Sequence, residues 1–101
     1  MSEAFDIAAL DDVIHGRLRL GIMAYLSGAG TADFNELKAK LQASDGNLSV
    51  HLRKLEEAGY VAIAKSFSQR KSLTRVALTD KGRSAFVAYL DAIEKLLPKH
   101  G

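Results

Sequence analysis

The stretch that decides the fold lies in the middle of the chain, at residues 44–61, and reads SDGNLSVHLRKLEEAGYV. Leu48, Leu52 and Leu55 recur at the spacing of one helix face, which predicts a helix with one buried side. Gly59 suits the position just after a helix C-terminus, where a left-handed backbone is common. Beyond Gly59 the larger apolar residues alternate with small or polar ones, so we expect the helix to lead into a β-strand.

A second short helix is expected just before this one. Residues 33–41 read DFNELKAKL, in which Asp33 should cap the first turn and Glu36 should complete a capping box. Only residues 42–44, Gln-Ala-Ser, separate the two helices, and Ser44 is a favoured N-cap for the second. Two short helices joined by so tight a turn predict a helix-turn-helix unit.

Further helices are expected at both ends of this unit. Residues 17–30, RLRLGIMAYLSGAG, have helical spacing, and Gly16 should separate them from a shorter helix within residues 7–15. Thr79 should cap a long helix over residues 80–97, which a proline ends.

The region between residues 60 and 79 reads as a β-hairpin. YVAIAKSF and LTRVALT both alternate in the way that a half-buried strand requires, and the basic SQRKS lies between them as the tip. The whole order predicts an α+β, mostly helical fold. It is a winged helix-turn-helix with a two-stranded β-hairpin wing and a long C-terminal helix.

Composition fits a single domain over residues 1–101. A hydrophobic fraction of 48% supports one compact core. A chain of 101 residues is too short for two ordinary domains. The apolar runs are too short to cross a bilayer, and the acidic start MSEAFDIAALDD is unlike a secretory signal. We therefore expect a cytoplasmic protein with no membrane partner.

Positive charge is concentrated in the middle of the chain. Residues 37–75 carry eight Lys and Arg side chains against three Asp and Glu, a net charge of +5, whereas residues 1–36 carry −4. The whole chain carries only +2, so the total conceals this asymmetry. A basic central segment indicates a polyanionic partner.

Catalytic and metal-binding functions are not expected. The sequence shows no nucleophile–base pair, no paired carboxylates and no Gly-rich phosphate loop. Zinc usually takes four ligands at close range, whereas this chain has no Cys and its three histidines, His15, His51 and His100, are scattered. We predict a non-enzyme with no catalytic residue, no metal and no cofactor. No pattern in the sequence identifies a small-molecule effector.

The stretch DGNLSVHLRKLEEAGYV, followed by a basic hairpin and by LTDKGRSAF, resembles the MarR-like winged-helix transcriptional regulators. More narrowly, it is similar to their small single-domain branch. The resemblance covers about residues 12–90, and its two motifs are fairly specific when they occur together at this separation. It implies a homodimeric transcriptional regulator, a repressor, that binds double-stranded DNA sequence-specifically.

The helix that starts near Asp45 is then the recognition helix. Its leucine side faces the body, so its other side is expected to enter the major groove. The residues expected to contact DNA from this helix are Asn47, Ser49, Val50, His51, Arg53 and Lys54. Asn47 suits adenine, Arg53 suits guanine or phosphate, and Val50 suits a thymine methyl group.

The hairpin is expected to supply the second DNA contact. Arg70 and Lys71 at the tip should reach phosphates or the minor groove, where negative potential favours an inserted arginine. Arg70 is the stronger candidate, because a guanidinium binds a groove or a phosphate more specifically than an ammonium. Lys65 and Arg75, on the arms, are expected to contact the DNA backbone.

The two ends of the chain are expected to form the dimer interface. The last helix is too long for a domain of this size to bury all its apolar residues, so residues 1–16 and 80–97 are the predicted dimerisation elements. The residues expected at the interface are Phe5, Leu10, Phe86, Tyr89, Leu90, Ile93 and Leu97. A two-fold dimer would place its recognition helices about 34 Å apart, one turn of DNA.

The alternative is a winged-helix module that binds another protein without contacting DNA. Arg53, Lys54, Arg70 and Lys71 weigh against it, because such a charge cluster suits phosphate and is unusual at an apolar protein interface.

Overall fold

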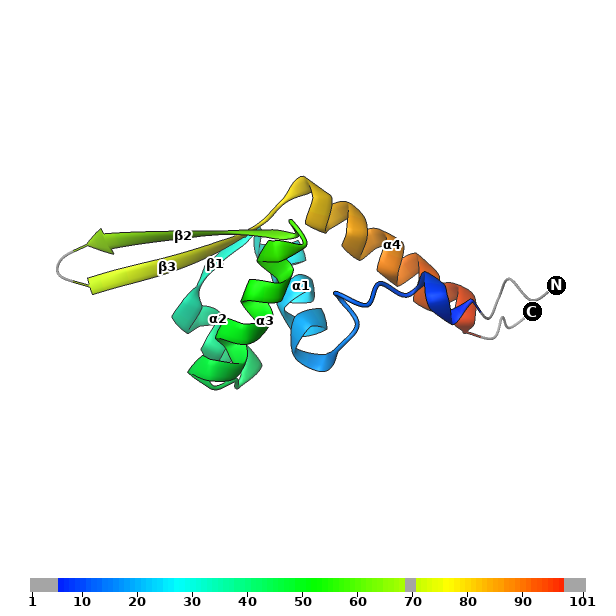
Figure 1. Cartoon of the computed structure of the whole chain (residues 1–101), viewed down its shortest axis with the longest axis horizontal. Helices are drawn as coiled ribbons and strands as arrows, with labels where there is room; N and C mark the ends of the chain where they lie inside the picture. Colours follow the sequence, from blue (N-terminus) through cyan, green and yellow to red (C-terminus); the bar gives the residue numbers. More distant parts are fainter. Residues whose placement is uncertain (1–5, 69–70, 98–101) are drawn as a thin grey trace.

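The computed structural model describes residues 6–68 and 71–97, without the side chains of Ser68 and Lys71. Figure 1 shows the path of the chain. Its elements in order are η2 (Ile7–Ala9), α1 (Arg17–Ala29), β1 (Thr31–Asp33), α2 (Phe34–Leu41), α3 (Asp45–Glu57), β2 (Val61–Ser68), β3 (Lys71–Leu78) and α4 (Asp80–Leu96). The predicted winged helix-turn-helix is confirmed. The short helix expected within residues 7–15 is only the 3-10 turn η2, followed by turns.

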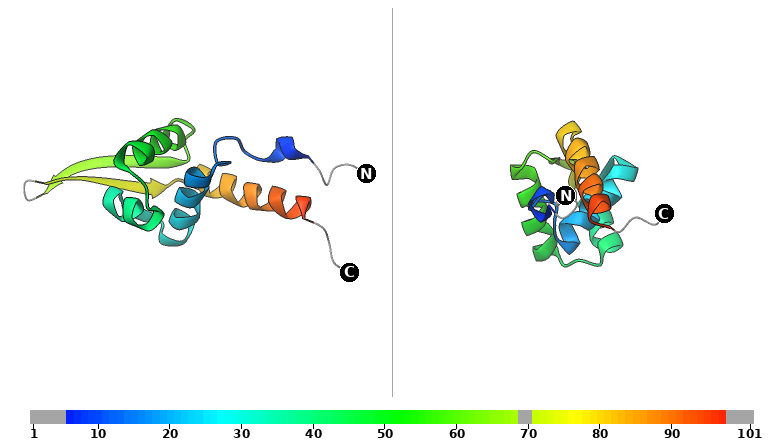
Figure 2. Two further views of the ribbon diagram at one scale, coloured as in Figure 1. Left: turned by 90° about the horizontal axis from the view of Figure 1, so that it is seen from below. Right: turned by 90° about the vertical axis from the view of Figure 1, so that its right-hand side faces the viewer.

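The molecule is elongated, and α1, α2 and α3 form a body at its centre (Figure 1). The hairpin β2–β3, which we call the wing, projects from one end of the body, and α4 runs out at the other with η2 beside it (Figures 1 and 2). The extents are 59 × 24 × 22 Å, so the long axis is set by the wing and α4 together. Two protruding parts therefore leave the body in opposite directions.

The sheet has three antiparallel strands in the order β1-β3-β2, rather than the two strands expected. The added strand β1 pairs Thr31 with Ala77 and Asp33 with Arg75. Three residues are too few to show alternation, so β1 gives no periodic signal in the sequence. Ala32 at its centre is buried, and the strand joins the helical body to the base of the wing.

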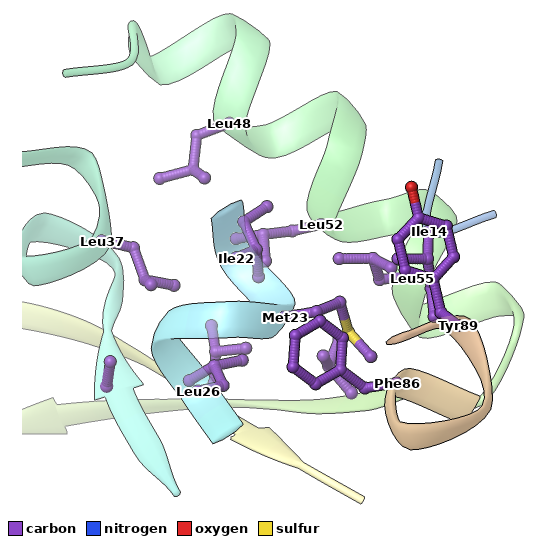
Figure 3. Close-up of a cluster of buried hydrophobic side chains, with 13 residues drawn as sticks. Ile14, Ile22, Met23, Leu26, Leu37, Leu48, Leu52, Leu55, Phe86 and Tyr89 are labelled. Atoms are coloured by element: carbon purple, nitrogen blue, oxygen red, sulfur yellow. The ribbon is translucent and has the colours of Figure 1, made fainter. Parts of the chain in front are cut away.

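The core gathers one face of each helix against the base of the sheet (Figure 3). Helix α1 contributes Ile22, Met23 and Leu26, all with no exposed surface. The leucine stripe of α3 lies opposite them, as predicted, with Leu48, Leu52 and Leu55 at 0–2% exposure. The other core members are Ile14, Ala32, Leu37, Val61, Val76, Phe86 and Tyr89. Burial of a Leu or Ile side chain contributes about 1.5–3 kcal/mol, so this cluster dominates stability.

The predicted helix caps are present. The Asp33 carboxylate accepts a hydrogen bond from the Glu36 N–H (2.7 Å), and the Ser44 hydroxyl accepts one from the Asn47 N–H (3.2 Å). Gly59 has φ +83°, the left-handed conformation expected after α3. The Glu36 side chain, however, accepts a hydrogen bond from the Tyr25 hydroxyl, so it ties α2 to α1 instead of completing a capping box. That hydrogen bond is the main reason why the pKa of Tyr25 is raised.

The wing strands are longer than the sequence suggested. They pair from Val61↔Leu78 to Ser68↔Lys71, so Ser68, Lys71 and Ser72 of the predicted SQRKS tip belong to strands, and its residues 69–70 lie outside the described residues. Alternating burial holds only at the base, where Val61 is 2% exposed, and fails at Phe67, which is 72% exposed. Beyond its base the wing has no body to pack against, because it projects away from the helices (Figure 1).

The LTDKGR motif forms the junction between the wing and α4. The Thr79 hydroxyl accepts the Gly82 N–H (2.9 Å) as the N-cap of α4 and donates to the Gly59 carbonyl (2.6 Å). Gly82 packs so closely that an added Cβ would lie 2.1 Å from the Tyr60 carbonyl oxygen. The sequence reading did not foresee this role for Gly82. The motif is therefore explained by packing, before any function is considered.

We predict that Gly82→Ala destabilises the fold by about 3 kcal/mol, because the methyl group overlaps backbone that cannot move without displacing the wing. Urea unfolding followed by circular dichroism measures this loss. Gly28→Ala in α1 is the matched control, since nothing lies within 4 Å of the position that its methyl group would take, and it should be neutral or stabilising by up to about 1 kcal/mol. Equal stabilities for the two variants would contradict the close packing at Gly82.

Candidate nucleic-acid interface

The outward face of α3 follows from the burial of its leucines. Because Leu48, Leu52 and Leu55 face the core, residues on the other side of the helix point to solvent. The predicted contact residues exposed there are Asn47, Ser49, Val50, Arg53 and Lys54. Val50 is 53% exposed in the middle of this polar face. A helix face with one exposed apolar side chain among hydrogen-bonding ones offers both kinds of contact that base edges need.

One flank of α3 faces the wing. A hollow of about 710 Å³ lies between them, and its lining includes Ser49 and Arg53 from α3 with Lys65 and Thr74 from the wing. Lys65 pairs with Thr74 across the wing, and Ile63 from the same face also lines the hollow. The structure therefore places Lys65 next to the exposed face of α3. Asp45 and Glu56 also line this hollow, and Asp45 is paired with Lys38 (2.7 Å).

Arg75 lies on the other face of the wing. Successive side chains of a strand point to opposite faces, and Arg75 is adjacent to Thr74, which lines the hollow beside α3. It also pairs in register with Asp33 of β1. Lys65 and Arg75 therefore lie on opposite faces of the wing, although both were predicted to contact the DNA backbone. Arg70 lies outside the described residues, and the described structure gives no side chain for Lys71.

The opposite flank of α3 carries cations that the sequence reading did not select. A second hollow, of about 500 Å³, is lined by Arg17 at the start of α1, Lys40 near the end of α2, and Asn47. Gln42 at the α2–α3 turn also lines it and adopts the left-handed conformation (φ 53°). Arg17 and Lys40 are 23 positions apart, so only the fold brings them together. Exposed cations therefore lie on both flanks of α3.

His51 is held from behind by α1. The Arg19 Nη1 lies 2.8 Å from the His51 Nδ1, and the Arg19 Nε donates to the Val13 carbonyl oxygen (2.6 Å). Burial, followed by the positive charges of Arg19 and Lys54, lowers the pKa of His51 below its usual value. The imidazole is therefore neutral near pH 7, and it is less exposed than its neighbours on α3.

The predicted dimer residues that the structure describes fall into three groups by burial. Phe86 and Tyr89 are 7% and 2% exposed, so they belong to the subunit's own core and have little surface for a partner. Leu10 and Ile93 are partly buried against that core. Leu90 of α4 and Leu97, the C-cap of that helix, are exposed. Ile7 in η2, within the predicted dimerisation segment 1–16, is exposed as well, and so is Val87 of α4, which was not among the predicted residues. Phe5 lies outside the described residues.

None of the helices in residues 6–68 and 71–97 is long and apolar enough to cross a bilayer. Within the same ranges, no three His, Cys, Asp or Glu side chains gather as metal ligands would.

Comparison with known proteins shows to which family the chain belongs. The family model for a winged helix DNA-binding domain matches residues 18–97. The chain belongs to this family. An uncharacterized protein of Methanocaldococcus jannaschii is 42% identical over 84 residues, which cover 83% of this chain and 91% of the relative. The family consists of DNA-binding domains of transcription regulators rather than of enzymes.

Solved structures place this winged helix among the MarR-family regulators. A transcriptional regulator homologue from Pyrococcus horikoshii has a TM-score of 0.79 at 29% identity, covering 93% of this chain and 92% of that one. AbfR of Staphylococcus epidermidis has a TM-score of 0.68 at 28% identity over 78% of this chain. The match covers only 53% of AbfR, so this winged helix corresponds to about half of that regulator. The MarR-like resemblance of the sequence is confirmed.

We predict that the fold loses stability as the pH falls below about 6.5, in part through His51. The unfolded chain takes up a proton near the usual pKa of 6.5, whereas the folded chain resists protonation because its His51 pKa is lowered. The loss should therefore begin as the pH falls through 6.5 and level off below the folded pKa. Urea midpoints of wild type and His51→Gln between pH 7.5 and 5 test this.

The two proteins should differ most at the acidic end of that range. His51→Gln has no imidazole at this position, so its midpoint should fall less over the same pH range. Parallel curves for the two proteins would contradict the lowered pKa of His51.

Proposed function

We propose that this chain is a homodimeric transcriptional repressor that binds double-stranded DNA sequence-specifically, with α3 in the major groove and the wing on the DNA backbone or minor groove. The observation that carries the proposal is the arrangement around α3. An exposed hydrogen-bonding and apolar helix face lies between two flanks that both carry exposed cations.

This arrangement matches the shape and charge of a major groove. The groove is about 12 Å wide, which admits one α-helix, and a phosphate backbone borders it on each side. With α3 inserted, Lys65 on one flank and Arg17 with Lys40 on the other would each face a backbone. Contacts of this kind fix position and register, while Asn47, Ser49, Val50 and Arg53 read bases.

The proposed dimer rests on the exposed apolar residues of α4. Val87, Leu90 and Leu97 lie three and seven positions apart, which puts them on one side of the helix, next to the core-facing side. They are 47–59% exposed in the single chain. The exposed Ile7 belongs to η2, which lies beside α4 (Figure 2), and we include it in the proposed surface. A second copy related by a two-fold axis would cover the surface with the same residues.

Repression is the proposed mode of regulation. Every described element belongs to the DNA-contacting body, the wing or the arm formed by η2 and α4. As a repressor, the protein would occupy its site and exclude other proteins from it. We further propose that it acts in the cytoplasm, where such a regulator meets DNA.

We predict salt-sensitive duplex binding that depends on the cations of both flanks. A dimer with six to ten phosphate contacts should lose about 10³-fold or more in affinity between roughly 50 and 200 mM salt. Arg17→Ala with Lys40→Ala should weaken binding to every duplex and reduce the salt slope by about two for each subunit. Fluorescence anisotropy of labelled duplexes measures both.

Two further variants test whether the effect depends on position and on DNA sequence. Lys95→Ala removes a positive charge from the last turn of α4, away from α3, and should change the slope much less. Asn47→Ala should reduce the preference for the selected site more than it weakens non-specific binding. If the wild type binds no duplex even at low salt, the protein-interaction alternative becomes the better reading.

We predict that Leu90→Glu with Leu97→Glu converts the dimer to a monomer, because charges at the centre of an apolar interface cannot be paired there. Sedimentation velocity at micromolar concentrations shows the change. Ala88→Glu, on the opposite side of α4 and also exposed, is the matched control and should stay dimeric. A wild-type monomer at this concentration would contradict the proposed interface.

A further inference from the structure

The contact between Arg19 and His51 joins residues 32 positions apart, and its chemistry is asymmetric. An arginine side chain has only hydrogen-bond donors, so at 2.8 Å from Arg19 Nη1 the His51 Nδ1 must be the acceptor. A neutral imidazole carries one N–H, and the one ring nitrogen left for that proton is Nε2. Arg19 therefore selects the Nε2–H tautomer of His51.

The surroundings keep His51 in this neutral form. Burial and the charges of Arg19 on α1 and Lys54 on α3 all act against the imidazolium and lower the pKa of His51. Asp12, before α1, and Glu57, on α3, line the hollow that Arg19 and Lys54 also line, so their carboxylates face this group of cations. A protonated Nδ1 would also point an N–H at the Arg19 guanidinium and break the contact.

His51 lies in a row of side chains that faces the proposed DNA. Asn47, His51 and Lys54 follow one another at spacings of four and three on one side of α3, and the outer two are exposed. Asn47 and Lys54 are hydrogen-bond donors suited to base edges or phosphates. A donor at His51 Nε2 would complete a continuous row of donors along this side of the helix.

We propose that Arg19 is a positioning residue for DNA recognition, holding His51 as an uncharged donor whose Nε2–H bonds an acceptor atom of the duplex. The inference rests on the proposed function. The Arg19 Nε donates to the Val13 carbonyl and its Nη1 to His51, so these two groups of the guanidinium are engaged within the fold. The acceptor on DNA is a phosphate oxygen or a purine base-edge atom.

A purely structural role for Arg19 makes different predictions. Arg19 also ties the turn before α1 to α3 through the Val13 carbonyl, so its loss could act through stability alone. A structural role would leave the pKa and the tautomer of His51 unrelated to affinity. The test therefore measures the protonation state of His51 and the energetic coupling between Arg19 and His51, in addition to the affinity for duplex DNA.

The first measurement is a side-chain proton–nitrogen NMR spectrum of the full chain, which distinguishes the two neutral tautomers. Wild type should show the Nε2–H form, and its His51 pKa should lie below that of a free imidazole. Arg19→Met should yield a mixture of tautomers and return the pKa toward 6.5. Lys95→Met, which removes one charge from α4, is the control and should leave His51 as it is. A proton on Nδ1 in the wild type would overturn the proposal.

The second measurement is affinity for a duplex that the wild type selects from a random pool. Arg19→Met and His51→Leu should each weaken binding about tenfold, the effect of one hydrogen bond, and the double variant should also lose about tenfold. Such non-additivity means that the two residues act through one contact. A loss of about a hundredfold in the double variant would show independent contacts and overturn the proposal.

A third test uses the conservative variant His51→Gln, and its result can be interpreted even if Arg19→Met folds poorly. His51→Gln places an amide N–H near the position of Nε2–H and should bind more tightly than His51→Leu; equal affinities would overturn the proposal. If His51→Gln recovers affinity for the selected duplex alone, the acceptor of the hydrogen bond is a base edge. If it recovers affinity for every duplex, the acceptor is a phosphate oxygen. If no duplex binds the wild type, the proposed function fails too, whereas selective binding that Arg19→Met leaves intact overturns this inference alone.

Discussion

The rotation of α3 about its own axis is fixed by its leucine stripe, and the rest of the interface depends on that angle. Leu48, Leu52 and Leu55 are each at most 2% exposed. Turning the helix by one residue, about 100°, would bring Ser49, Arg53 and Glu56 into the core. Burying two unpaired charges costs several kcal/mol, and the three leucines would lose about 2 kcal/mol each. The outward face is therefore determined by apolar packing, without reference to any ligand.

The junction after α3 fixes the two protruding parts in the same way. Gly59 turns the chain, Thr79 donates to the Gly59 carbonyl, and Gly82 packs on the Tyr60 carbonyl. These contacts hold Gly59 and Tyr60, the two residues just before the wing, against the first turn of α4. The wing and α4 consequently leave the body from one rigid point, in opposite directions (Figure 1). If the wing contacts DNA and the arm dimerises, as proposed, their positions at opposite ends would depend on the stiffness of this junction.

The local part of this architecture could be predicted from the sequence, because its causes lie within a few residues. The leucine stripe, the Ser44 and Thr79 caps and the turn at Gly59 are all short-range patterns, and the structure contains each of them. The strand β1 could not be predicted, because three residues become a strand only by pairing with β3.

The division of α4 into core and exposed residues was also beyond the sequence. Helical spacing placed Phe86, Tyr89 and Leu90 on one broad apolar side, but only the packing of α1 shows where the core ends. The cations of the second flank were missed for a related reason. Arg17 and Lys40 meet only because α1 and α2 cross, so proximity along the chain gave no signal.

The turn before α1 connects the two proposed surfaces. Tyr60, at the base of the wing, donates to the Asp11 carboxylate, and burial followed by this hydrogen bond raises its pKa to about 12, so the donor proton stays in place. The Val13 carbonyl holds Arg19 against α3, and the His15 ring is hydrogen-bonded to the Tyr89 hydroxyl of α4 (2.8 Å).

Side chains bonded to this one short segment thus come from the wing base, from α1 behind the recognition helix, and from α4. A dimer formed through α4 and η2 would hold this segment from one side, and DNA would hold it through α3 and the wing from the other. Whatever orders residues 11–15 therefore orders both surfaces. The arm formed by η2 and α4 is in this respect continuous with the body that carries α3, and pairing two arms would set the orientation of both α3 helices together.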